Sequence, residues 1–162
     1  MENIFAQPGK PMPHGATIVN DGVNFSVFTR NGTSVILDIF QNPEDENPCF
    51  SYTFDPKINR TGDIWHVFLK GLKAGALYLY RVDGPFNPEK GHRFNKNTYL
   101  LDPYAKSFTD CSVFANLPPD YVTPVDKIDI LTGKPHSAKG FPKCVVIDDD
   151  EFDWQGDRPI NY

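Results

Sequence analysis

The stretch Val23–Phe40 reads VNFSVFTRNGTSVILDIF, and its pattern decides the predicted fold. Apolar and polar side chains alternate along Val23–Arg30, which is typical of a half-buried strand. Val35–Phe40 follows as a second strand, with Val35, Leu37 and Ile39 on one face and Ile36, Asp38 and Phe40 on the other. The dipeptide Asn31-Gly32 between them is favoured in type I′ turns, where both central residues need positive φ. The stretch therefore predicts two antiparallel strands joined as a β-hairpin.

Further strand-like segments lie on both sides of this stretch, separated by turn residues. They are Gly15–Asn20, Phe50–Phe54, Ile64–Leu69 and Leu77–Val82. Short strands at intervals of about ten residues predict an all-β sandwich or barrel. A βαβ arrangement needs helices between strands, and the connections are too short for them. The predicted fold is an immunoglobulin-like β-sandwich over residues 1–84.

Residues 85–162 are different in character, because Pro, Asn, Asp and Lys become frequent and periodicity fades. Asp102 and Pro103 have the residue types of a helix N-cap and first helical position, so a short helix is expected there. Cys144–Ile147 reads as a short apolar strand. A long irregular segment is uncommon in a compact domain. We expect residues 85–162 to be an extension that packs on the sandwich and also meets a further partner.

Composition excludes several classes of function. The 162 residues carry a formal net charge of −5 with no basic block, so binding to nucleic acid is not expected. The first residues lack a signal-peptide pattern, and no apolar run is long enough to span a membrane. The chain is therefore expected to be cytoplasmic, with no membrane partner. Its 3 Cys and 4 His lack metal-ligand spacing, so neither a metal nor a cofactor is expected.

Catalytic motifs are not recognisable in the sequence. The acidic run Asp148–Glu151 is interpreted as a solvated turn rather than a calcium site, because it lacks the alternating ligand spacing and central Gly. No nucleophile elbow or phosphate-binding loop is present. His92, beside Arg93 in a polar loop, is the one histidine considered as a ligand contact.

Aromatic side chains raise the question of sugar binding, because sugar rings stack on exposed aromatic faces. In Leu77–Val82 the alternation directs Tyr78 and Tyr80 into the core, with Leu79 and Arg81 on the other face. Phe86, just after the Asp83-Gly84-Pro85 turn, is the aromatic residue best placed to be partly exposed.

The string LYLYRVDGPFNPEKGHRFNKNTYLLDPY at Leu77–Tyr104 resembles the N-terminal domain of bacterial glycogen debranching enzymes and isoamylases. These enzymes belong to the α-amylase family of glycoside hydrolases. Similar motifs occur in the same order at Gly22–Ser26, Ile64–Leu72 and Asp153–Pro159. The resemblance implies a β-sandwich related to glycogen-binding modules.

In that family the segment matching Asp153–Pro159 leads into a catalytic barrel, which carries the catalytic carboxylates. The present sequence stops where the first barrel strand would begin, so no catalytic residue is assigned. The resemblance implies a non-catalytic accessory domain of an α-1,6-glucosidase whose partner is the barrel.

The alternative is a free-standing module that binds α-glucan through Phe86, Asn87, His92 and Arg93. Glycogen-binding relatives carry Trp at the position of Phe86 and a basic residue at the position of Leu79. These differences predict weak glycogen binding and favour the accessory role.

Overall fold

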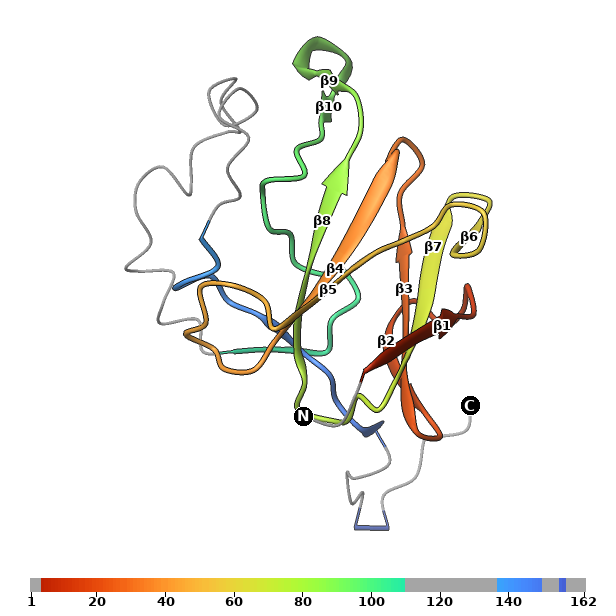
Figure 1. Ribbon diagram of the computed structural model, residues 1–162, viewed down its shortest axis with the longest axis vertical. Helices are drawn as coiled ribbons and strands as arrows, with labels where there is room; N and C mark the ends of the chain where they lie inside the picture. Colours follow the sequence, from red (N-terminus) through yellow and green to blue (C-terminus); the bar gives the residue numbers. More distant parts are fainter. Residues whose placement is uncertain (1–3, 110–136, 150–154, 157–162) are drawn as a thin grey trace.

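The computed structural model describes residues 4–109, 137–149 and 155–156, which form two antiparallel sheets packed face to face (Figure 1). One sheet has the order β1-β7-β3-β2, with β6 also paired to β7. Its strands are β1 (Phe5–Pro8), β2 (Gly15–Val19), β3 (Gly22–Phe28), β6 (Arg60–Thr61) and β7 (Ile64–Lys70).

The second sheet has the order β11-β12-β8-β4-β5. Its strands are β4 (Ser34–Phe40), β5 (Phe50–Thr53), β8 (Leu77–Asp83), β11 (Ser107–Phe108) and β12 (Cys144–Val145). No α-helix occurs within the described residues, so the all-β sandwich predicted from the alternation is confirmed.

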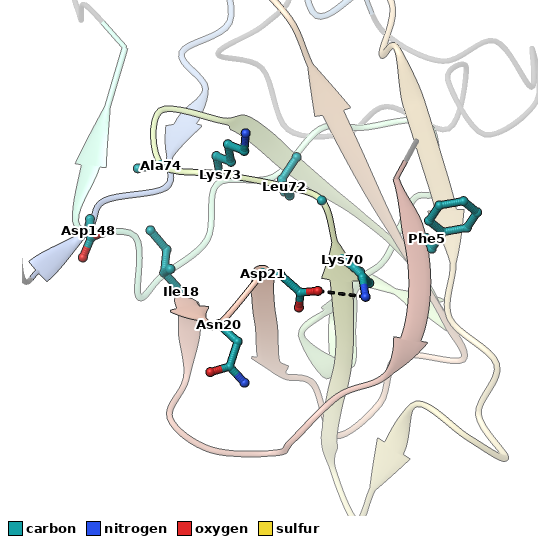
Figure 2. Close-up of a pocket in the computed structure, with 10 residues that line it drawn as sticks. Phe5, Ile18, Asn20, Asp21, Lys70, Leu72, Lys73, Ala74 and Asp148 are labelled. Carbon is teal, nitrogen blue, oxygen red and sulfur yellow. Dashed lines mark ion pairs between the residues drawn. The ribbon is translucent and has the colours of Figure 1, made fainter. Parts of the chain in front are cut away.

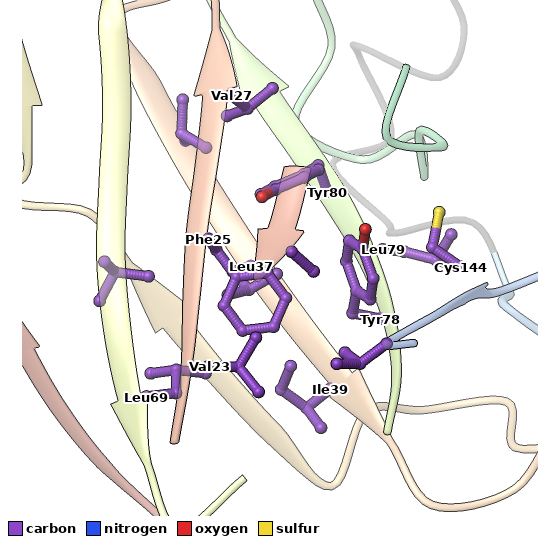
Figure 3. Packing of buried hydrophobic residues seen from close by; sticks show 14 of the residues in the cluster. Val23, Phe25, Val27, Leu37, Ile39, Leu69, Tyr78, Leu79, Tyr80 and Cys144 are labelled. Atoms are coloured by element: carbon purple, nitrogen blue, oxygen red, sulfur yellow. The ribbon is translucent and has the colours of Figure 1, made fainter. Parts of the chain in front are cut away.

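The core lies between the two sheets (Figure 3). Val23 and Phe25 of β3 face Leu37 of β4 and Tyr78 of β8, and all four side chains are inaccessible to solvent. The rings of Phe25 and Tyr78 meet edge to face with their centroids 5.0 Å apart. Each such burial stabilises the fold by roughly 1.5–3 kcal/mol. The predicted inward orientation of Tyr78 and Tyr80 is also confirmed, since both are buried.

The polar face of β3 is buried as well. The side chain of Asn24 accepts a hydrogen bond from the backbone N–H of Lys10 and donates one to its carbonyl, at 2.7 and 3.0 Å. Ser26 Oγ donates to the carbonyl of Pro11 at 2.7 Å. The segment before β2 therefore covers this face. Its backbone forms hydrogen bonds with polar side chains that the alternating pattern predicts to be exposed to solvent.

The predicted β-hairpin at Asn31-Gly32 is wrong. β3 pairs with β2 and β7, whereas β4 pairs with β5 and β8, so the connection crosses between the sheets. Neither residue of the dipeptide has positive φ. Gly32 N–H instead bonds Thr29 Oγ1 at 3.2 Å. A Cβ on Gly32 would lie 2.8 Å from the Thr29 side chain and 3.0 Å from Val82 Cγ1, so tight packing explains the glycine.

Residues after 84 also contribute to the core. Cys144 and Val145 pair with β8, which confirms the strand predicted at this point, and Cys144 is fully buried. The predicted helix at Asp102 is wrong: the chain makes one turn, in which Asp102 Oδ1 accepts from Tyr104 N–H at 2.9 Å. Tyr78 O–H donates to Asp102 Oδ2 at 2.8 Å, so the carboxylate is held in the core rather than capping a helix. The division of the chain after residue 84 stays a prediction.

Across the described part of the chain, no helix has the length and apolar character needed to cross a membrane. The cytoplasmic location stays a prediction.

Candidate functional site

The four residues considered for sugar binding lie on one small hairpin beyond the end of β8 (Figure 1). It consists of β9 (Phe86–Asn87), the 3-10 turn η1 (Pro88–Lys90) and β10 (His92–Arg93). Asn87 pairs with His92, and Phe86 pairs with Arg93. Directly opposite residues of an antiparallel pair point to the same face. Asn87 and His92 therefore point to one face of the hairpin, and Phe86 and Arg93 point to the other face.

Local interactions explain the shape of the hairpin. Asn87 Oδ1 accepts from the backbone N–H of Lys90 at 3.3 Å and so caps η1. Gly91 ends the turn with φ of 79°, a value that favours glycine. His92 stacks on Phe94, with ring centroids 6.3 Å apart and planes 29° apart. Phe86 is half-buried and Arg93 is exposed, which agrees with the partial exposure predicted for Phe86.

The face of the second sheet that points away from the core carries a buried ion pair. Arg81 Nε and Nη2 donate to the two carboxylate oxygens of Asp38 at 2.5 and 3.0 Å, and Ser51 Oγ also donates to this carboxylate. Burial opposes the charge on Arg81, but the Asp38 interactions outweigh this and raise its pKa. The Tyr99 ring lies 5.6 Å from the guanidinium carbon. Leu79, expected on this outer face, is fully buried.

A hollow of about 600 Å³ lies at the opposite end of β8, around the connection from β7 (Figure 2). Its lining residues are Phe5, Ile18, Asn20, Asp21, Lys70, Gly71, Leu72, Lys73, Ala74 and Asp148. Lys70 Nζ and Asp21 Oδ2 pair at 2.8 Å. Their hydrogen bond lowers the pKa of Asp21 and raises that of Lys70. The sequence pattern could not bring together residues this far apart in the chain.

Metal binding has no support in the part of the chain that the structure describes, where no group of three His, Cys, Asp or Glu side chains gathers. Asp149 forms an ion pair with Lys106. Asp148 lines the hollow around the β7–β8 connection, whereas Asp150 and Glu151 lie outside the described residues. Of the motif at Asp153–Pro159, only residues 155–156 are described.

A family model described as carbohydrate-binding module 48 (isoamylase N-terminal domain) matches residues 13–105. The chain belongs to this family, and the resemblance inferred from the sequence motifs is confirmed. The match includes β2 to β10 and therefore the whole hairpin.

Among curated relatives, Isoamylase 1, chloroplastic, from Arabidopsis thaliana is 39% identical over 98% of this chain and 19% of its own length. A glycogen debranching enzyme from Yersinia enterocolitica is 41% identical over 93% of this chain and 20% of its own length. The chain thus spans about a fifth of the length of these relatives.

Solved structures support the fold. The multi-modular glycogen-degrading pneumococcal virulence factor SpuA matches with a TM-score of 0.59 and 14% identity, covering 92% of this chain and 13% of that one. A pullulanase of Group B Streptococcus, SAP, matches with a TM-score of 0.56 and 19% identity, covering 90% of this chain and 16% of that one.

Proposed function

We propose that the chain is a non-catalytic accessory domain of a glycogen debranching enzyme of the isoamylase type, acting in α-glucan metabolism. The observation that carries the proposal is the extent of similarity. Relatives with isoamylase and debranching names match nearly the whole chain, yet the match occupies about a fifth of their length. The larger part of such an enzyme then supplies the catalytic barrel.

Two buried carboxylates fit a structural role. Asp38 is bound by Arg81 and Ser51, and Asp102 accepts hydrogen bonds from Tyr78 and Tyr104. Glycoside hydrolysis needs two carboxyl groups facing one substrate bond across a fixed gap. Both are instead bound by protein groups, Asp38 on the outer face of the second sheet and Asp102 in the core, which supports the absence of catalysis by this domain.

The proposed partner is the catalytic barrel, in the same polypeptide as in the relatives. Leu100, Tyr104 and Phe108 are large apolar residues that are 41–49% exposed and close together in the chain. Exposed apolar groups in one region favour a protein interface. They belong to residues 85–162, the segment proposed to lie against the barrel, with residues 1–84 as the sandwich core.

The second candidate is an α-glucan-binding module, favoured by the hairpin that gathers Phe86, Asn87, His92 and Arg93. One aromatic contact contributes roughly 0.5–1.5 kcal/mol beyond burial. Millimolar affinity needs about 4 kcal/mol. The hairpin alone is therefore expected to bind glycogen weakly.

The test is hydrolysis of glycogen and pullulan by the purified chain, measured as released reducing sugar. The expected result equals that of a mock-purified sample, with a debranching enzyme as positive control. Release above the mock level, lost in Asp38→Asn or Asp102→Asn variants that remain folded, would overturn the non-catalytic assignment.

A further inference from the structure

A second hollow, of about 230 Å³, lies at the base of the β9–β10 hairpin, beside the end of β8. Its lining residues are Val82, Gly91, Arg93, Phe94, Asn95, Thr98 and Leu100. One wall is fixed, because Leu100 and Tyr80 exchange backbone hydrogen bonds at 2.8 and 3.0 Å. The hollow is therefore bounded by the sheet edge as well as by the chain that follows the hairpin.

Two polar atoms of this lining lack hydrogen-bond partners among the described residues. Asn95 is 7% exposed, and its Oδ1 accepts from Asn97 N–H at 2.9 Å, but its Nδ2 has no partner there. Thr98 Oγ1 is likewise buried and unpaired. Buried polar groups are nearly always paired, so two unpaired ones that line the same hollow point to a bound ligand or water.

Positive charge is concentrated in the chain around this hollow. Residues 90–96 contain Lys90, Arg93 and Lys96 but no acidic residue, although the formal net charge of the whole chain is −5. Arg93 is exposed and lines the hollow. None of the described lining residues carries a carboxylate. The local charge therefore favours an anionic ligand over a cation.

The hydrogen-bonding groups of the lining indicate which kind of anion fits. Asn95 Nδ2 and the guanidinium nitrogens can only donate, and the Thr98 hydroxyl can donate as well. A phosphoryl group offers several strong acceptor oxygens, and arginine binds it with two parallel N–H···O bonds. Val82, Phe94 and Leu100 supply apolar surface beside these donors. The lining thus matches a phosphoryl group attached to a small group with an apolar face.

We propose that this hollow binds a small organic phosphomonoester through its phosphoryl group, an inference that does not depend on the proposed function. Its volume is below the roughly 300–1,000 Å³ of typical drug-sized ligand sites, so the ligand is small. Inorganic phosphate shares the phosphoryl chemistry but has no apolar part to cover Val82 and Phe94. Of the four residues predicted for the hairpin site, this hollow uses Arg93 alone.

The experiment uses phenyl phosphate as the probe, because it combines a phosphoryl group with an apolar ring. It is titrated to about 10 mM into the isotopically labelled full chain, at an ionic strength held constant with sodium chloride, while the side-chain amide signals of Asn95 are followed by NMR. These signals are expected to shift with saturation, at a Kd of about 1 mM. Phenol, which is the same ring without the phosphoryl group, is expected to leave them unchanged.

Arg93→Met removes the charge from the lining and is expected to weaken phenyl phosphate binding about tenfold. Its unfolding stability should match that of the parent, because Arg93 is exposed. Lys90→Met is the matched control, since it removes the same charge from an exposed residue of the same hairpin that is not among the described lining residues. It should change the Kd by less than about twofold, because salt screens exposed charges. Thr98→Val, which keeps the shape and removes the hydroxyl, provides a second lining variant with an expected loss of about tenfold.

Inorganic phosphate distinguishes the two sources of a phosphoryl group. Binding weaker than that of phenyl phosphate would support an organic phosphomonoester as the ligand. Equal binding of the two compounds would overturn that assignment in favour of free phosphate.

Three further results would overturn the site. Unchanged Asn95 signals with both phosphate compounds would assign the hollow to water alone. Equal shifts with phenol and phenyl phosphate would mean that only the ring is recognised. Equal weakening by Arg93→Met and Lys90→Met would reduce binding to a general attraction between an anion and a basic segment.

Discussion

At the scale of single residues, Lys143 shows how the segment after residue 136 is held to the sandwich. Its side chain is fully buried, and Nζ donates to the carbonyls of Ala138 at 2.9 Å and Pro43. The ammonium also lies 4.9 Å from the centre of the Phe40 ring. Burial lowers the pKa of Lys143, against the opposing effect of Glu44 and Asp45. The residue thus joins two parts of the chain that are distant in sequence, residues 138–143 and residues 40–43.

Lys143→Met is expected to lower the free energy of unfolding by about 1–3 kcal/mol, because it leaves buried carbonyl groups without donors. Urea unfolding followed by tryptophan fluorescence measures the change. Lys139→Met is the matched control, since Lys139 is an exposed lysine in the same segment. Equal stability of the two variants would show that the buried ammonium does not hold this segment.

Stability at high pH depends on buried groups that resist losing a proton. Burial raises the pKa of Cys144 to about 12 and raises that of Tyr78 and Tyr80 as well. A raised folded-state pKa gives stability that is complete below the unfolded pKa, about 8.5 for Cys, and is lost as pH rises toward the folded value. Lys143, whose pKa is lowered, acts in the opposite direction.

The Cys144→Ala variant isolates one of these contributions. The parent chain is expected to lose about 1–2 kcal/mol more than the variant between pH 8 and 10, because only the parent contains this thiol. Urea midpoints measured at several pH values test the difference. Parallel pH profiles for the two proteins would mean that the thiol ionises equally easily in both states.

Residue burial was only partly predictable. Alternation placed Tyr78 and Tyr80 inside correctly, because their environment is the facing sheet. It could not foresee that Leu79 is also buried. Nor could it identify Asn95 and Thr98, because a hollow forms only once their loop lies beside β8.

At the scale of elements, the ion pair between β4 and β8 is the main polar link on the outer face of the second sheet. Asp38 is fully buried, and Arg81 binds both of its oxygens. Removing one partner of a buried pair leaves an unpaired charge, which is more damaging than replacing both partners by apolar groups.

Arg81→Leu is therefore expected to destabilise the fold by about 3 kcal/mol or more, and Asp38→Leu combined with Arg81→Leu should recover part of that loss. Lys70→Met breaks the exposed pair with Asp21 and should leave the urea midpoint unchanged. A double variant no more stable than the single one would contradict this account of the pair.

The β9–β10 hairpin leads to a prediction about glycogen. Retardation of the chain in a glycogen-containing native gel is expected to be weak, and Phe86→Ala should not change it, because the half-buried ring offers little stacking surface. His136→Ala, a substitution remote in sequence from the hairpin, serves as a general control. Strong retardation that Phe86→Ala abolishes would favour the binding-module alternative.

Strands were predictable because each carries its own period-two pattern, and six of the described strands follow from it. Their pairing was not. The Asn31-Gly32 dipeptide favours a hairpin locally, but β3 and β4 each bury an apolar face against the other sheet, so the chain crosses the sandwich at this point. The residue types in a turn indicate the local backbone conformation. They do not indicate to which sheet each flanking strand belongs.

At the scale of the whole molecule, the sequence motifs identified the family, and the β-sandwich agrees with it. The hairpin residues were predicted as a group but lie on two faces. The central claim is that this chain is the accessory domain of a debranching enzyme and works by packing on its catalytic barrel. Such a domain should be needed for the barrel to fold or function, even though it contributes no catalytic group.

The most direct measurement is debranching activity after co-expression with the catalytic part of the Yersinia enterocolitica enzyme deprived of its own matching N-terminal segment. The account predicts that the two chains co-purify and that soluble debranching activity rises well above that of the catalytic part alone. Tyr104→Asp, an exposed-site change, should reduce this gain if Tyr104 contributes to the interface. A catalytic part that is equally soluble and active with and without this chain would contradict the claim.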